Sequence, residues 1–242
     1  MSNVATIMGM ASQKPLPPSF AGSNANNAPN GGSVVFYSVN GDYDTLEAGD
    51  FVVAIHSVGI TANLLTSMTC VNLTSNGVNE VAALYANDTY DTNLKVYAGT
   101  LATRPSSIAF SDVGNTSAGC AAIIMWFKNV AYSESPATVT GTNTYYVTPP
   151  DANGLRPDDI VVCCGGDAHN NSIGSYTNPS DLTNFIDLIG SDTNDTYAGM
   201  GIYVVPSGVT SFNPSQWITS STTTTLTSGS FAAATIVLRA IQ

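Results

Sequence analysis

The chain has 242 residues, of which only 10% are charged, and its formal net charge is −11. Nearly a third of the residues are Ser, Thr or Asn, so hydroxyl and amide groups rather than ions hydrate its surface. Six scattered cations cannot neutralise a row of phosphates, and an anionic membrane surface would repel so acidic a chain. We therefore expect neither nucleic acid nor membrane among its partners. We also expect no signal peptide and no membrane span, because the first ten residues lack a basic start and no apolar run is long enough.

Residues 1–33 are predicted to form an extended N-terminal arm. Four of the twelve prolines fall between positions 14 and 32, and consecutive prolines favour polyproline II and cannot donate to a sheet. The arm is either a solvated tail or a segment that docks on a neighbouring subunit. Its apolar side chains favour docking, because a solvated tail would not need them. The expected assembly contacts are Ile7, Met8, Met10, Leu16 and Phe20.

Residues 34–242 are predicted to form a single all-β domain, either a β-sandwich or a jelly roll. Short runs rich in Val, Ile, Thr, Tyr and Phe alternate with turn residues, and only three Glu and three Lys are present to support helices. A helical turn is an alternative for 78–85 and for 181–188. The predicted strands lie near 34–39, 51–57, 68–73, 94–98, 107–110, 120–128, 138–148, 160–165, 183–189, 200–205, 217–227 and 231–241.

Two pairs of segments repeat along the chain. Residues 46–55 resemble 155–164 at an offset of 109, and residues 116–128 resemble 227–239 at an offset of 111. These nearly equal offsets predict two similar halves, about 46–140 and 155–242. A single small sheet cannot bury its apolar face alone, so the sheets of the two halves are expected to pack against each other.

Each half opens with a strand led by an aspartate and closes with a strand that ends on a cation. The aspartates are Asp50 and Asp159, and the cations are Lys128 and Arg239. We expect each aspartate to accept backbone N–H bonds where the chain turns into the sheet, and to have no catalytic role.

The four cysteines show no CxxC spacing and no association with histidine. We therefore expect buried, reduced thiols, as in a protein made in a cytoplasm. Cys163 and Cys164 are adjacent in a predicted strand and should point to opposite faces of the sheet.

No combination of residues predicts catalysis. Asp167, His169 and Ser172 lie within six residues, but a catalytic triad depends on convergence in space, and we expect a polar surface loop here. His56 lies in an alternating strand without an obvious partner. Glycoside hydrolysis needs two carboxylates at a set separation. The three glutamates lie at predicted loop or edge positions, and no pair among the seventeen carboxylates is singled out by the sequence. We expect no enzyme activity and no cofactor.

Two Asp-rich loops share a D-T-x-D-T core, one at 88–92 and the other at 192–196. Their oxygen atoms would suit Ca²⁺, but neither loop has the spacing of an EF-hand, and such loops between strands are ordinary turns. We therefore predict no metal site.

The two tryptophans differ in context. Trp126 lies in the most apolar run of the chain and is predicted to be core. Trp217 follows a proline-containing turn, where core packing is the first interpretation and a platform for stacking a glycan is the second.

The chain resembles a family of tailed-bacteriophage virion proteins, which includes head-decoration, minor tail and tail-fibre proteins. The resemblance covers most of 46–242. It rests on the Gly-Asp strand opening at 49–54, the strand at 121–128, the Pro-Ser-Gly at 206–208, Trp217 and the closing strand at 231–239. It implies a β-sandwich or jelly roll with a structural role in the virion, and it does not imply an enzyme.

We consider three functions, given in the order in which the sequence favours them. The first is a structural virion protein, a capsid-decoration or tail-appendage subunit made in the host cytoplasm. It would bind major capsid or tail proteins through its arm and sheet edges, and would form a homo-oligomer, for example a trimer. The second is a glycan-binding module of a tail fibre that recognises the host surface, and the third is a secreted glycan hydrolase.

Overall fold

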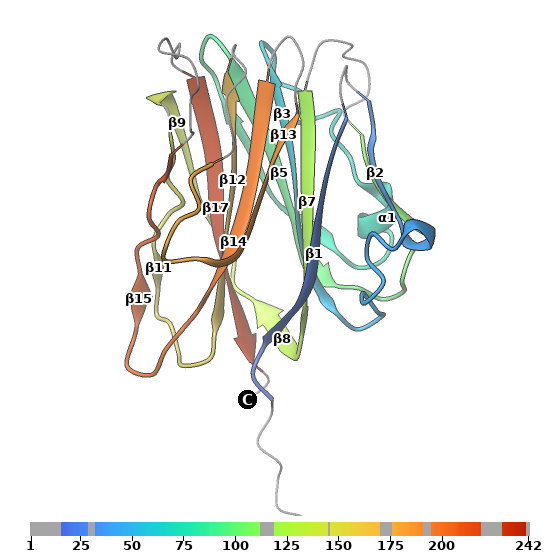
Figure 1. The fold of residues 1–242 in the computed structure, drawn as a ribbon, viewed down its shortest axis with the longest axis vertical. Coiled ribbons are helices and arrows are strands. Elements are labelled where there is room, and N and C mark those ends of the chain that lie inside the picture. The colour runs from blue at the N-terminus through green and yellow to red at the C-terminus, as the bar shows by residue number, and fades with distance from the viewer. Residues whose placement is uncertain are drawn as a thin grey trace, which may run out of the picture.

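The chain folds into a sandwich of two antiparallel sheets (Figure 1). All-β architecture was predicted and is confirmed. Among the described residues, no helix is long and apolar enough to cross a bilayer. The computed structural model describes residues 16–28, 32–111, 119–144, 146–169, 176–190, 195–218 and 229–240.

The first sheet has five strands. Their order across the sheet is β1 (Ser19–Ala28), β7 (Gly119–Lys128), β3 (Phe51–Ile60), β5 (Asp91–Thr100) and β4 (Asn79–Ala86). The three central strands are buried on both faces. This burial explains the nearly continuous apolar runs of β3 and β7, whereas β5 also buries Asp91, Thr92, Asn93 and Lys95.

The second sheet repeats this order with strands from the second half, joined at one edge by two strands from residues 130–144, which the predicted boundaries place largely in the first half. The order is β13 (Thr183–Gly190), β14 (Asp195–Val204), β12 (Ile160–His169) and β17 (Gly229–Ala240), and the far edge of β17 pairs with β8 (Val130–Ser133) and β9 (Ala137–Thr144). Hence β3 corresponds to β12, β5 to β14, β4 to β13, β7 to β17 and β1 to β9.

The contacts between the sheets follow the same correspondence. β3 crosses β12 at the centre, β5 packs on β17 as β7 packs on β14, and β4 contacts β9 as β13 contacts β1. The two halves are therefore related by an approximate two-fold axis. The inner core is apolar, with Ile55, Ile123 and Met125 from the first sheet meeting Val162, Met200 and Ile236 from the second.

Short elements cover the outer faces. The first sheet is covered by β2 (Val34–Tyr37), α1 (Val71–Thr74) and β6 (Ser107–Phe110), and the short helix η1 (Ser38–Asn40) follows β2 without burying a residue. The second is covered by β10 (Tyr146–Val147), β11 (Ala152–Asn153), β15 (Ser211–Phe212) and β16 (Trp217–Ile218). Each sheet thus buries both faces, and the molecule has three apolar layers.

Two local predictions were wrong. Residues 19–28, assigned to the extended arm, form strand β1, because their backbone pairs with β7 along its whole length. Residues 71–74, which overlap the strand predicted near 68–73, form α1. The strand predicted near 183–189 is confirmed as β13, and the helical turns considered as alternatives at 78–85 and 181–188 are instead the edge strands β4 and β13.

Candidate functional site

Trp217 is completely buried in the outer core of the second sheet. Its ring lies edge-on to Tyr176 and Phe185, with centroids 5.8 and 5.2 Å away. Gly199 allows this packing, because a Cβ at that position would lie 2.9 Å from the indole ring. The ring has no face open to a sugar, so the prediction that Trp217 stacks a glycan was wrong and the core interpretation holds.

The strand-opening aspartates act as turn residues, as predicted. Asp50 accepts the backbone N–H of Glu47 at 2.9 Å, and Asp159 accepts that of Arg156 at 2.7 Å. Each carboxylate also binds the cation that ends its own half, an ion pair the sequence analysis missed. Lys128 Nζ lies 2.7 Å from Asp50 Oδ1, and Arg239 binds Asp159. Asp50 and Asp159 therefore tie the opening strand of each half to its closing strand, which is its neighbour in the sheet.

The two ion pairs differ in burial. The Lys128 side chain is 36% exposed, whereas that of Arg239 is 4% exposed. Arg239 is also held by Glu134 through Nε at 2.9 Å and by the carbonyl of Gly154 at 3.1 Å. The guanidinium is thus enclosed by acceptors on several sides, as a buried cation requires.

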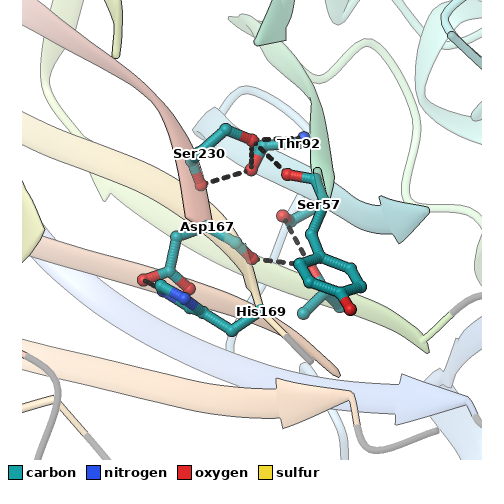
Figure 2. A network of polar contacts seen from close by, with 7 residues as sticks. Ser57, Thr92, Asp167, His169 and Ser230 are labelled. Carbon is teal, nitrogen blue, oxygen red and sulfur yellow. Dashed lines mark hydrogen bonds and ion pairs between the residues drawn. The ribbon is translucent and has the colours of Figure 1, made fainter. Parts of the chain in front are cut away.

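Polar side chains bridge the two sheets at one end of the sandwich (Figure 2). Ser57 Oγ on β3 lies 3.1 Å from Thr196 Oγ1 on β14, and Thr92 on β5 donates its hydroxyl to the Ser230 carbonyl on β17 at 2.6 Å. Thr92 and Thr196 occupy corresponding strands. Each half therefore contributes one threonine that bonds across the sandwich.

Asp167 and His169 lie at the same end, on β12 (Figure 2). We predicted a surface loop there, but residues 165–169 continue the strand and are buried, because β12 pairs with strands on both sides. His169 Nε2 is 3.1 Å from Asp167 Oδ2. Burial, together with the nearby Asp167 carboxylate, raises the pKa of Tyr176 well above its ordinary value. Ser172 lies outside the described residues.

His56 is buried on the outer face of β3, against the ring of Phe110 at 5.6 Å. Among the residues that the structure describes, neither ring nitrogen has a hydrogen-bond partner. Lys95 faces His56 on β5 and binds Glu80 on β4 at 2.6 Å. Burial, with a smaller effect of the Lys95 charge, lowers the pKa of His56 from 6.5 to about 3. The imidazole is therefore neutral in the folded protein near neutral pH.

This burial predicts a pH-dependent stability. Below pH 6.5 the unfolded chain protonates His56 while the folded protein does not, so stability falls with pH until about pH 3. Between pH 7 and pH 5 this single group should cost about 2 kcal/mol, at about 1.4 kcal/mol per pH unit below 6.5. Urea unfolding at the two pH values measures this effect. Between pH 7 and pH 5, we expect the free energy of unfolding of the wild type to fall by about 2 kcal/mol more than that of His56→Leu. Equal losses in the two proteins would contradict the assignment.

In the Asp-rich turn at 88–92, a carboxylate of the turn accepts hydrogen bonds from neighbouring residues of the same chain segment. Asp91 Oδ1 accepts the backbone N–H of Asp88 at 2.8 Å, and the Tyr85 hydroxyl donates to Asp91 Oδ2. Residues 191–194 of the equivalent turn lie outside the described residues. Within the part of the chain that the structure describes, no three His, Cys, Asp or Glu side chains gather in a way that could hold a metal ion.

All four cysteines are buried thiols. Cys163 packs in the outer core and Cys164 in the inner core, so they point to opposite faces as predicted. Burial raises the pKa of Cys70 and of Cys164 to about 12, which makes both thiols unreactive near neutral pH.

A groove lies along one side of the sandwich, where β4 of the first sheet meets the β8–β9 segment of the second. It has a volume of about 490 Å³ and is lined by residues 81–84 on one wall and by Ser133, Glu134, Ser135, Pro136 and Thr138 on the other. β4 is the last strand of its sheet. The groove therefore exposes a strand edge, and we refer to it as the edge groove.

Of the predicted assembly contacts, two lie in the described part of the chain. Phe20 packs edge-on against Phe127 of its own β7, with ring centroids 6.0 Å apart, so its contact is intramolecular. Leu16 is 67% exposed. Ile7, Met8 and Met10 lie outside the described residues.

Comparison with known proteins found no match to any protein-family model, curated protein or solved structure.

Proposed function

We propose that the protein is a non-enzymatic structural subunit of a tailed-phage virion, a capsid-decoration or tail-appendage protein. It assembles as a homo-oligomer and binds other virion proteins, major capsid or tail proteins among them. The observation that carries the proposal is the character of the four edge strands, β1, β4, β9 and β13.

These strands are long and almost uncharged. Each has eight or ten residues, and their only ionisable carboxylates or cations are Glu80 and Asp187. Edge strands of monomeric proteins are usually short or carry charges, especially lysine, that prevent pairing with another chain. Long edges without cations suit a protein whose edges meet other subunits.

Each edge strand nevertheless carries one extra residue relative to its neighbour, near Ala21, Val81, Asn143 and Asn184. Such bulges bend and twist an edge and so limit indiscriminate pairing. The low charge adds a second advantage, because hydroxyl and amide surfaces lose less solvation energy than ions when another subunit covers them.

The resemblance to phage virion proteins rests mainly on residues that form this scaffold. The segments at 121–128 and 231–239 lie in β7 and β17, and the segment at 49–54 leads into β3. These segments form the sandwich itself. The sheet edges and the N-terminal residues are therefore the surfaces left to contact partners.

Deletion of residues 1–15 tests this function. The deletion must end before Leu16, because removing β1 would strip the edge of β7. We expect the truncated protein to show wild-type urea unfolding but to be lost from purified phage particles, as measured by immunogold labelling and mass spectrometry. Incorporation at wild-type copy number would contradict the role of these residues, and turnover of a polysaccharide by the purified protein would contradict the non-enzymatic assignment.

A further inference from the structure

The edge groove has the properties of a site for an added strand. β4 contributes Val81, Ala82, Ala83 and Leu84 to it, and no strand of the described chain pairs with the outer edge of β4. Backbone N–H and C=O groups at a free sheet edge bind an extended segment by strand addition, while side-chain pockets select its residues. The small side chains of Ala82 and Ala83 leave space beside the edge.

On the opposite side of the sandwich, the equivalent edge strand is covered by a strand of the other sheet. There β13, the counterpart of β4, packs against β1, and Asn27 Nδ2 donates to the carbonyl of Ile189. On the groove side, the Glu134 N–H still donates to the Val237 carbonyl of β17 at 3.0 Å, and the chain then leaves the sheet at Ser135 and Pro136 before β9 resumes the pairing with β17. The interruption at these residues opens the edge groove.

Residues 4–11 of the same sequence suit this edge. They read Val-Ala-Thr-Ile-Met-Gly-Met-Ala and contain no proline and no charged residue. This segment has the same length as β4, which has eight residues. Lys14 is the only charged residue among the first 18, and Arg239 already binds Glu134 on the groove wall, so the segment brings no charge that the groove would leave unpaired.

The position of Pro17 favours a neighbouring molecule over the same chain. The Asn129 side chain donates to the Pro17 carbonyl at 3.3 Å, which places Pro17 at the end of β7. A strand added outside β4 would lie four strand spacings from β7, about 19 Å away. The six residue steps from Ala11 to Pro17 span at most about 20 to 22 Å when fully extended. Binding to its own groove would therefore need a taut, straight connection, whereas binding to a second copy would not.

We propose that residues 4–11 of one copy add as an antiparallel strand to the outer edge of β4 in a second copy and fill its edge groove. This inference rests on the proposed function, because it specifies which surfaces join the subunits. The N-terminal segment of one copy contacts the edge groove of another, so the interface is heterologous. Repeating this contact either closes a ring of subunits or extends them into a chain.

Disulfide trapping of the full chain tests the proposal. Chains carrying Ile7→Cys are mixed with differently tagged chains carrying Ala83→Cys, and the covalent heterodimer is measured on a non-reducing gel. The matched control replaces Ala83→Cys with Val39→Cys, because Val39 is 85% exposed and lies on η1, away from the groove. The native cysteines are buried, so the introduced thiols dominate the reaction.

We expect about tenfold more heterodimer with Ala83→Cys than with Val39→Cys, because docking raises the effective concentration of the two thiols. Equal yields would overturn the proposal. A double variant, Ile7→Cys with Ala83→Cys, that links only within one chain would overturn the second copy as occupant. If trapping fails while deletion of residues 1–15 still abolishes incorporation, the proposed function stands and the edge groove is excluded as its docking site.

Discussion

Replacing Arg239 with methionine is expected to lower the free energy of unfolding by about 3 to 5 kcal/mol, the usual cost of removing one partner of a buried ion pair. The substitution leaves Asp159 buried with the backbone N–H of Arg156 as its remaining described donor. It also releases Glu134 and the carbonyl of Gly154, which Arg239 binds. Urea unfolding with linear extrapolation gives the free energy directly.

The first half provides the matched control. Lys128→Met removes the equivalent cation from Asp50, but the Lys128 side chain is 36% exposed, so its own interaction with the carboxylate is already screened by solvent. We expect a loss of about 1 kcal/mol, near the upper range for exposed ion pairs. Equal losses in the two variants would show that burial of Arg239 does not determine its contribution.

Replacing Trp217 with alanine is expected to cost about 3 to 5 kcal/mol, as for other large-to-small substitutions of buried aromatic residues. The ring fills the space between Phe185, Tyr176 and Gly199. Its removal leaves a cavity that these neighbours can only partly fill. The measurement is again urea unfolding, supported by near-UV circular dichroism to follow the packing of the tyrosines.

Trp217→Phe is the control, because it keeps an aromatic ring in the same cavity and should lose clearly less stability than the alanine variant. A loss below about 1 kcal/mol for Trp217→Ala would be typical of a surface substitution rather than of core packing. It would reopen the interpretation of Trp217 as a binding surface.

The central strands β3 and β7 could be predicted from sequence because they are buried on both faces and are therefore largely apolar. β1 could not, because its sequence, Ser-Phe-Ala-Gly-Ser-Asn-Ala-Asn-Asn-Ala, has the composition of a loop. Its strand conformation comes from pairing with β7 and from the contact of Phe20 with Phe127. These are tertiary interactions that local propensity does not record.

The glycines of β12 misled the prediction at Asp167 and His169. Gly165 and Gly166 suggest a loop, but in the structure they permit close packing. A Cβ at Gly166 would lie 2.2 Å from Ser57 Oγ in the opposite sheet. The ion pairs of Asp50 and Asp159 had a visible signal, since both halves begin with an aspartate and end with a cation. The contact itself was missed because turn formation already accounted for each aspartate.

The edge groove was beyond prediction for a different reason. One wall comes from residues 81–84 of β4 and the other from residues 133–136 and Thr138 of the β8–β9 segment, which are far apart in the sequence. Only the approach of β4 to β9 brings these segments together. The sequence predicted sheet edges and N-terminal residues as contact surfaces, but not which edge is open.

The approximate two-fold axis gives the sandwich the geometry of an isologous dimer whose two protomers are joined in one polypeptide. In a true homodimer, every substitution at such an interface occurs twice, so a change must suit both copies at once. Joining the halves removes that constraint. At the position of His56 in β3, the repeat offset of 109 places Gly165 in β12, where Val147 would lie 2.7 Å from an added Cβ. One half can therefore hold a buried imidazole, and the other a close backbone contact, at equivalent places in the same scaffold.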